Sequence, residues 1–424
     1  MLTSYADPSE PSHGHASPEI QVARGSLPTH SSSRRVMSKP RIMVVYGTRP
    51  EAIKMAPLVR AIEADGTLEP HVVVTGQHRE MLDQVNSLFR ITPQRDLDIM
   101  GRNQTLAQVS SRILDGLDPI IVATAPAAVV VQGDTTTSTM AALAAFYRRV
   151  PVVHLEAGLR SGNLAAPFPE EANRRLTAQL ARLHLAPTPG ARDNLLAEGL
   201  SPEAVVVTGN TVVDALLTTV ASAHPVADTQ ARAAIERGAP IVLVTVHRRE
   251  NWGEVMEGIG DAIHNLATRL PEHQIILPLH RNPLVRSSLL PRVDQLPNVL
   301  VTEPLGYADF TALLQAATLV VSDSGGVQEE APSLGKPVLV LRDTTERPEA
   351  VRAGTVRLVG TAPERIVDEV MSLLTDRAAY DAMAHATNPY GDGHAARRAV
   401  VALRHMLGLG PRPADFDPNC PEQA

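Results

Sequence analysis

The chain has 424 residues, of which 44% are hydrophobic and 20% are charged, and its formal net charge is −7. This length exceeds one ordinary domain of roughly 150 residues, so two or three domains are expected. The negative balance excludes a general attraction to nucleic acid or to anionic membranes, so local basic groups must hold any anionic ligand.

The first 38 residues are rich in Ser, Pro and His and contain few large apolar side chains. Such a segment cannot bury enough surface to offset the entropy cost of ordering, so residues 1–38 are predicted to be a disordered extension. The segment lacks the basic-then-apolar pattern of a secretory leader. Its His residues are irregularly spaced, which favours plain disorder over a metal-binding tract.

From residue 39 onward, short runs of β-branched residues alternate with longer helical patterns, which is typical of parallel sheets covered by helices on both faces. In the first half, strands are expected at residues 41–46, 69–76, 128–132, 151–156 and 182–187. The alternation restarts with strands at 240–246, 274–279, 298–303, 318–323, 337–342 and 355–360. The predicted fold class is α/β, with two Rossmann-like, doubly wound parallel-sheet lobes that face a cleft. The lobes are expected at residues 39–210 and 211–390.

The first strand leads into the turn "GTRPEAIK" (47–54), in which Pro50 stands where a helix start tolerates proline. Arg49 in the turn and Lys54 one helical turn further on are placed where a phosphate would lie. A plain strand-to-helix connection with surface cations explains the same pattern, so this stretch alone leaves both readings open.

Two later strands of the first lobe each end in an acid, Asp134 after residues 128–132 and Glu156 after residues 151–155. Ligands of open parallel sheets bind beyond the carboxyl ends of the strands. Both acids should therefore project from one sheet edge into the cleft. The following segment "PFPEEANRR" (167–175) adds Glu170 and Arg174, which also fit an ordinary ion pair one helical turn apart.

The second lobe opens with "VTVHRREN" (244–251), which places His247 and two arginines at the end of its first strand. Further on, Ser324, Gly325 and Gly326 follow a strand and begin a helix. Two glycines let the backbone approach a ligand closely, and free N–H groups at a helix start suit a diphosphate. Glu330, one turn into that helix, can accept hydrogen bonds from ribose hydroxyls, and Arg347 lies past the next strand.

Several other patterns carry less weight. "GIGDAI" (258–263) lies inside a helical pattern and lacks the third glycine of a dinucleotide fingerprint, which argues against NAD. "DLD" (96–98) resembles a metal-binding triplet but lies in an expected irregular loop, so no metal is predicted. The longest apolar stretch, residues 119–131, contains Pro126 and is shorter than the about 20 residues of a membrane helix.

The chain ends with a Pro-rich polar segment, and residues 409–424 are predicted to be a disordered tail. Cys420 is the single cysteine and cannot form an internal disulfide. This cysteine usage and the missing leader pattern favour a cytoplasmic protein.

Together, the stretches "GTRPEAIKMAPL", "TGQHREMLDQV", "GDTTTS", "HLEAGLRSG", "PFPEEANR", "TGNTVVDAL", "VHRREN" and "DSGGVQEEAPSLGKPVLVLRDTTERPEAV" resemble the non-hydrolysing bacterial UDP-N-acetylglucosamine 2-epimerases. The resemblance spans about residues 41–408. It implies a fold like that of GT-B glycosyltransferases, with a C-terminal helix at residues 391–408 that crosses back to the first lobe. It also implies a homodimer built on first-lobe helices.

The resemblance further implies reversible C2 epimerisation of UDP-N-acetylglucosamine to UDP-N-acetylmannosamine without any cofactor. UDP leaves C1 while the C2 proton is removed, which gives 2-acetamidoglucal, and readdition with protonation on the other face completes the reaction. In matched positions, Asp134, Glu156 and Glu170 are the catalytic carboxylates, with Arg174 orienting one of them and His247 aiding diphosphate departure. The matched UDP-binding positions are Arg49, Lys54, Phe310, Ser324, Gly325, Gly326, Glu330 and Arg347.

Two positions depart from the family pattern, Gln132 where relatives often have His and Leu305 where some have Gln. Some relatives also bind a second UDP-N-acetylglucosamine as an activator, and Gln77 and His78 match that region. Three alternatives stay open from the sequence. They are a hydrolysing 2-epimerase that releases ManNAc and UDP, a 2-epimerase of another UDP-amino sugar, and a GT-B glycosyltransferase.

Overall fold

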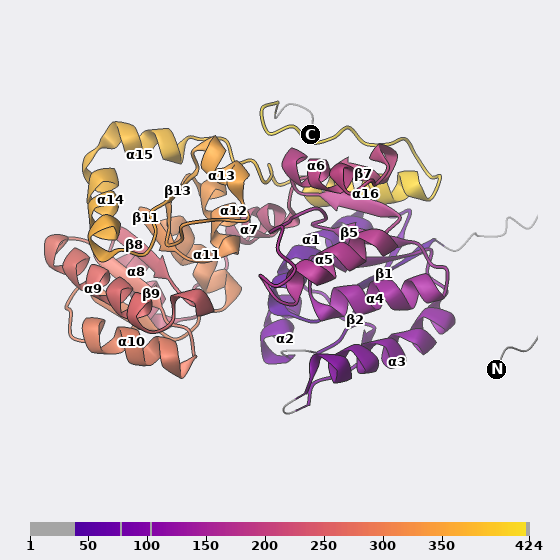
Figure 1. Ribbon diagram of the computed structural model, residues 1–424, viewed down its shortest axis with the longest axis horizontal. Coiled ribbons are helices and arrows are strands. Elements are labelled where there is room, and N and C mark those ends of the chain that lie inside the picture. The colour runs from indigo at the N-terminus through magenta and orange to yellow at the C-terminus, as the bar shows by residue number, and fades with distance from the viewer. Residues whose placement is uncertain (1–38, 77–78, 102–103, 421–424) are drawn as a thin grey trace, which may run out of the picture. The chain divides into compact units, whose positions relative to one another are not determined.

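The computed structural model describes residues 39–76, 79–101 and 104–420. The predicted extension at residues 1–38 lies outside these ranges. Two parallel sheets occur in the unit that begins at Lys39, and helices connect their successive strands (Figure 1). The predicted α/β class with two parallel-sheet lobes is therefore confirmed.

The first sheet has seven strands in the order β3-β2-β1-β4-β5-β6-β7. Its strands are β1 (Arg41–Tyr46), β2 (Glu69–Val74), β3 (Arg95–Asp96), β4 (Ala128–Gln132), β5 (Val152–Leu155), β6 (Leu183–Ala186) and β7 (Val205–Val207). The helices of this part are α1 (Arg49–Asp65), α2 (Arg79–Leu88), α3 (Leu106–Thr124), α4 (Thr136–Tyr147), α5 (Glu170–Leu180), α6 (Pro189–Ala197) and α7 (Thr211–Ala221).

The second sheet has six strands in the order β10-β9-β8-β11-β12-β13. Its strands are β8 (Ile241–Thr245), β9 (Gln274–Pro278), β10 (Val299–Thr302), β11 (Leu319–Ser322), β12 (Val338–Val340) and β13 (Val356–Leu358). The remaining helices are α8 (Thr229–Glu236), α9 (Glu254–Arg269), α10 (Pro283–Val293), α11 (Tyr307–Ala316), α12 (Gly325–Glu330), α13 (Pro348–Ala353), α14 (Pro363–Thr375), α15 (Arg377–Ala384) and α16 (Ala395–Met406).

Side chains of one strand alternate between two cores, because successive residues of a strand point to opposite faces of the sheet. In β1, Val44 belongs to a cluster with α1, whereas Val45 belongs to a different cluster with α3 and α4. In β8, Leu243 joins the same cluster as Val44, whereas Val244 packs with α9 and α14. Both sheets are therefore buried on both faces, which explains their continuous apolar runs.

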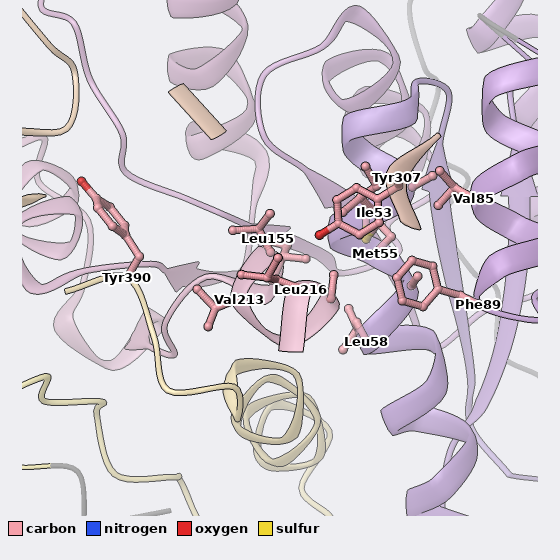
Figure 2. Packing of buried hydrophobic residues seen from close by; sticks show 14 of the residues in the cluster. Ile53, Met55, Leu58, Val85, Phe89, Leu155, Val213, Leu216, Tyr307 and Tyr390 are labelled. Atoms are coloured by element: carbon pink, nitrogen blue, oxygen red, sulfur yellow. The ribbon is translucent and has the colours of Figure 1, made fainter. Parts of the chain in front are cut away.

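One cluster of buried apolar residues joins side chains of the two lobes. Met55 of α1, Leu216 of α7 and Tyr307 of α11 all belong to it (Figure 2). The ring centroids of Phe89 and Tyr307 are 6.4 Å apart, so first-lobe and second-lobe aromatics pack against each other. Helix α16 also returns to the first lobe, where Arg404 Nη1 lies 3.0 Å from Asp65 Oδ1 at the end of α1.

Two strands of the first sheet, β3 and β7, were not predicted from the sequence. They have two and three residues, respectively, and each is the outermost strand at one edge of the sheet. Such short edge strands lack the long β-branched run that marks a buried strand. The predicted irregular loop around "DLD" therefore contains a strand at Asp96.

Residues 409–424 were predicted to be a disordered tail. The structure describes this segment as far as residue 420, and part of it lies along β7. Phe416 N donates to Val207 O over 2.8 Å, and Val207 N donates to Asp415 Oδ1, also over 2.8 Å. Arg412 Nη2 donates to Val205 O. These contacts satisfy backbone groups that an edge strand leaves unpaired. A prediction of disorder from amino-acid composition does not take such hydrogen bonds into account.

Candidate active site

The turn between β1 and α1 is fixed by a capping box. Thr48 accepts from the backbone N–H of Glu51, and the Glu51 carboxylate accepts from the N–H groups of Gly47 and Thr48. Thr135, which begins the turn after β4, also donates to Glu51, over 2.6 Å. The buried Glu51 carboxylate therefore ties the ends of β1 and β4 together and fixes the position of Arg49 at the first residue of α1.

Asp134 lies in that second turn, between β4 and α4, and faces Arg174 of α5. Arg174 Nη2 is 2.5 Å from Asp134 Oδ2. Burial raises the pKa of Asp134, and the guanidinium of Arg174 opposes that rise without cancelling it. The negative charges of Glu156 and Glu170 contribute to the rise. Asp134 is thus a carboxyl group with an elevated proton affinity beside a cleft.

Glu156 follows β5 and has a left-handed backbone, with a φ of 62°. A non-glycine residue in this conformation is strained, and such strain is concentrated at functional sites. The carboxylate accepts hydrogen bonds from Lys54 Nζ, Gln132 Nε2 and Asn210 Nδ2. Burial raises the pKa of Glu156, but Lys54, Arg347 and the Asn210 amide together outweigh burial and leave the pKa below the ordinary value. Glu156 is therefore held in its charged form.

Arg347 and Glu330 are the buried charged residues of the second lobe that face the same cavity. Arg347 Nε donates to Glu329 Oε1 over 2.7 Å, and its Nη1 donates to Glu346 Oε1. Tyr307 OH donates to Glu330 Oε1 over 2.8 Å. Burial raises the pKa of Glu330 to about 7, so this carboxyl gains from ligand hydroxyl groups that donate to its charged form.

His247 lies directly after β8 and is oriented by the fully buried Asp323. Its Nδ1 is 3.1 Å from Asp323 Oδ1, and its backbone N–H donates to the same carboxylate. Burial raises the pKa of Asp323, but the contacts with His247 outweigh burial and lower it. The Asp323 contact fixes the imidazole ring, while 44% of the His247 side chain stays exposed at the cavity.

These residues line one cavity of about 670 Å³, which has walls from both lobes. The first lobe supplies Arg49, Lys54, Asp134, Glu156 and Arg174, and the second lobe supplies His247, Phe310, Ser324, Gly325, Gly326, Glu330 and Arg347. The volume is in the range of sites that enclose a small organic ligand. Both walls carry carboxylates and arginines, and the second-lobe wall adds the glycine backbone at Gly325 and Gly326.

Three residues named from the sequence are not placed in this cavity. Glu170 is the first residue of α5, and it is not among the described residues that line the cavity, although its charge acts on Asp134. The ordinary ion pair between Glu170 and Arg174, which was the alternative reading of this segment, is not formed. Arg174 contacts Asp134 and Glu171 instead. Gln77 and His78 lie outside the described residues.

Sequence reasoning missed Asn210 and Glu329. Asn210 caps α7 and donates to both Glu156 and Glu329, and Glu329 in turn accepts from Arg347. A signal was present in "TGNTVVDAL", where Asn before a helical pattern marks an N-cap. Gln132, which departs from the family pattern, also has a clear place, since its amide donates to Glu156.

Gly325 provides a prediction with a matched control at the next position. A Cβ at Gly325 would lie 2.5 Å from Arg347 Nη1 and 2.7 Å from its Cζ, whereas a Cβ at Gly326 meets only Glu330 Oε2 at 3.6 Å. Arg347 cannot move away cheaply because Glu329 and Glu346 hold it. We expect G325A to weaken UDP binding by about tenfold or more and G326A by less than about threefold, measured by calorimetry. Equal affinities for the two variants would contradict this account.

Among the described residues, no three His, Cys, Asp or Glu side chains are grouped as a metal site would require. The helices in the same part of the chain include none that is both long and apolar enough to span a membrane.

Comparisons with known proteins point to one family. The family model described as UDP-N-acetylglucosamine 2-epimerase matches residues 60–404. A probable UDP-N-acetylglucosamine 2-epimerase of Ralstonia nicotianae is 51% identical over 372 residues, which cover 86% of this chain and 98% of the relative. The family model thus extends through both lobes and begins after the cavity segment that holds Arg49 and Lys54.

Solved structures agree with the sequence relatives. A putative UDP-N-acetylglucosamine 2-epimerase of Listeria monocytogenes has a TM-score of 0.83 at 46% identity, covering 90% of this chain and 100% of its own. The UDP-GlcNAc 2-epimerase of Neisseria meningitidis, bound to UDP-GlcNAc, has a TM-score of 0.80 at 46% identity, covering 86% of this chain and 100% of its own. A glycosyltransferase of kitacinnamycin, at 14% identity and a TM-score of 0.60, shares the fold alone.

Proposed function

The chain belongs to the family of UDP-N-acetylglucosamine 2-epimerases, and from this premise we propose that it interconverts UDP-N-acetylglucosamine and UDP-N-acetylmannosamine by elimination and readdition of UDP. The observation that carries the mechanism is the pair Asp134 and Glu156. Both face one cavity, and their environments displace their pKa values in opposite directions. Such a pair suits one proton-transfer group and one permanent negative charge.

In the elimination step, the C2–H bond and the bond from C1 to the diphosphate oxygen break together, giving 2-acetamidoglucal and bound UDP. No carbonyl adjoins C2, so the developing positive charge at C1 must be stabilised by the site. Glu156, held ionised by Lys54, supplies that negative charge. Asp134, with its raised pKa and its partner Arg174, suits proton transfer at C2.

Readdition returns UDP to C1 and a proton to the opposite face of C2, so a second proton-transfer group is required. Glu170 is the proposed candidate. It starts the helix that carries Arg174, one turn away on the same helix face, and its charge already acts on Asp134. Closure of the segment before α5 over a bound sugar would bring it to the ring.

The nucleotide is proposed to lie against the second lobe. Glu330 would accept from the ribose hydroxyls, and Phe310 would pack beside the base. Arg347 and Arg49, with the backbone at Ser324, Gly325 and Gly326, would hold the diphosphate, because guanidinium and N–H groups donate to phosphate oxygens. His247, oriented by Asp323, is positioned to protonate or hydrogen-bond the departing diphosphate.

A homodimer through first-lobe helices stays part of the proposal. Three large apolar side chains are exposed near the ends of α3 and α4, namely Val122 (58%), Phe146 (54%) and Tyr147 (67%). Exposed apolar side chains gathered on neighbouring helices suit a subunit contact. Activation by a second UDP-N-acetylglucosamine, a cytoplasmic location and independence from any cofactor are also part of the proposal.

The decisive experiment follows UDP-N-acetylglucosamine by NMR in D₂O with purified protein. We expect UDP-N-acetylmannosamine to form and deuterium to appear at C2 of both epimers. Stoichiometric free ManNAc would identify a hydrolysing enzyme instead. A need for an acceptor without deuterium at C2 would identify a glycosyltransferase. Started from UDP-N-acetylmannosamine alone, the same reaction should show a lag if an activator is needed.

A further inference from the structure

Asn210 and Glu329 are two buried polar residues behind the active-site cavity. Their exposed fractions are 2% and 0%, and neither is among the described residues that line the cavity. Asn210 caps α7 of the first lobe, and Glu329 belongs to α12 of the second. Buried polar groups of this kind are costly unless every hydrogen-bonding atom has a partner. The hydrogen-bond partners of Asn210 and Glu329 therefore indicate the role of these two residues.

The orientation of the Asn210 amide is determined by its surroundings. Its Oδ1 accepts from the backbone N–H of Val212 over 3.1 Å as the helix cap, and its own backbone N–H donates to Tyr390 O over 2.6 Å. The Nδ2 atom must then face the other way. It lies 2.9 Å from Glu156 Oε1 and 3.1 Å from Glu329 Oε2. An amide nitrogen carries two hydrogens, so it can donate to both carboxylates at once.

These bonds complete a continuous chain of charged groups between the lobes. Lys54 contacts Glu156, Asn210 joins Glu156 to Glu329, and Glu329 accepts from Arg347. Two carboxylates and two cations are thus linked through one neutral amide. Without the amide, the carboxylates would face each other with no donor between them, and like charges at short range in a buried site favour uptake of a shared proton.

We propose that Asn210 and Glu329 are positioning residues that couple the diphosphate-binding guanidinium of Arg347 to the carboxylate of Glu156. The inference rests on the proposed function for the roles of Arg347 and Glu156. A bound diphosphate adds negative charge at Arg347 and weakens its hold on Glu329. Asn210 then keeps both carboxylates separated and ionised, so that Glu156 stays charged while the nucleotide is present.

The direction of the effect depends on every charged or titratable group that faces the carboxylate pair. These groups come from α1, the turn after β4, β5, α12, the segment before α13 and the segment before α16. Those that act on the pair directly are Lys54, Asp134, His154, Glu330, Arg347 and Tyr390, whereas Glu346 acts through Arg347. All of them remain when Asn210 is changed. Loss of the amide therefore removes one donor that lowers the pKa of Glu156. Loss of the Glu329 charge instead removes the mutual repulsion of the two carboxylates, which favours their protonated forms.

The test compares kcat and KM across pH for the wild type, Asn210→Ser and Glu329→Gln. Serine keeps a helix cap but cannot bridge the carboxylates, and glutamine keeps an acceptor for Arg347 without its charge. The acidic limb of the kcat profile should show two bends, the upper one for Asp134 and the lower one for Glu156. We expect the lower bend to move up by about one pH unit in N210S and down in E329Q, with KM changed by less than about threefold. Shifts in the same direction, or none, would overturn the proposal.

Asn388→Ser is the matched control for a merely structural role. The Asn388 amide also contacts α12 and its continuation, through the backbone carbonyl of Glu329 and the hydroxyl of Ser333, but not a carboxylate. We expect N388S to lower the melting temperature without moving the pH profile. A profile shift in N388S equal to that of N210S would mean that loosening this region alone accounts for the effect, which would also overturn the proposal.

A second measurement does not need turnover. Proton uptake on binding of UDP, measured by calorimetry in buffers of different ionisation enthalpy, should exceed the wild-type value in N210S and fall below it in E329Q. Equal uptake in all three proteins would contradict the coupling. A different outcome would count only against the proposed function. In that outcome the three proteins show the expected order of proton uptake on UDP binding, but the wild type never forms the mannosamine epimer.

Discussion

Replacing Asp134 by Asn is expected to lower kcat by about 10²- to 10⁴-fold while the Kd for UDP changes by less than about threefold. Asparagine has nearly the same shape but cannot take up the C2 proton. Most of the proposed nucleotide-binding groups lie on the second-lobe wall, and Asp134 is not one of them, so UDP affinity should survive. Epimer formation followed by NMR and UDP binding followed by calorimetry measure the two quantities separately.

Asp118→Asn is the matched control for this change. Asp118 also pairs with an arginine, since Arg148 Nε lies 2.6 Å from its Oδ1, but the pair is exposed at the surface of α3 and α4. We expect kcat of D118N to stay within about twofold of the wild type, because exposed ion pairs contribute little. If D134N kept most of its activity, or lost UDP affinity in proportion to kcat, Asp134 would not be the proton-transfer group.

Replacing Lys54 by Met is expected to lower the free energy of unfolding by about 3–5 kcal/mol and to abolish turnover. Only 13% of the Lys54 side chain is exposed, and its ammonium lies against Glu156 and acts on Glu329. Methionine fills a similar volume but leaves two buried carboxylates with one cation fewer. The pKa of Glu156 should then rise, so that the carboxyl takes up a proton more readily and loses the charge that the elimination step requires.

Lys336→Met provides the comparison for the Lys54 variant. Lys336 is half-buried, and no ion pair involves it in the part of the chain that the structure describes. Burial lowers the pKa of its ammonium, so its replacement should change stability by less than about 1 kcal/mol. Urea unfolding followed by circular dichroism measures both variants. A loss below about 1 kcal/mol in K54M would show that Glu156 does not depend on this partner.

The α/β class and most strands could be predicted from the sequence, because a parallel sheet buried on both faces requires continuous β-branched runs. The runs at residues 41–46 and 128–132 are strands with the predicted bounds. The edge strands β3 and β7 were not predicted, because a run of two or three residues is too short to show a hydrophobic period. The contacts of Asp415 and Phe416 with β7 were not predicted either, because they depend on unpaired backbone groups that lie far away along the chain.

The sequence by itself determined which side chains stand at the carboxyl ends of strands. Twelve of the residues proposed from the sequence for catalysis or UDP binding line one cavity, and those at the strand ends, such as Asp134 and Glu156, do so for this reason. This succeeds because strand ends of a parallel sheet share an edge whatever the details of packing.

Only the tertiary structure decided the chemical state and the partners of those side chains. Asp134 and Glu156 look alike in sequence, yet Arg174 faces the first and Lys54, Gln132 and Asn210 surround the second. Likewise, the sequence left open which carboxylate Arg174 contacts, and in the structure it is Asp134. Burial and charge depend on groups far apart along the chain, and only folding brings those groups within a few ångströms of each other.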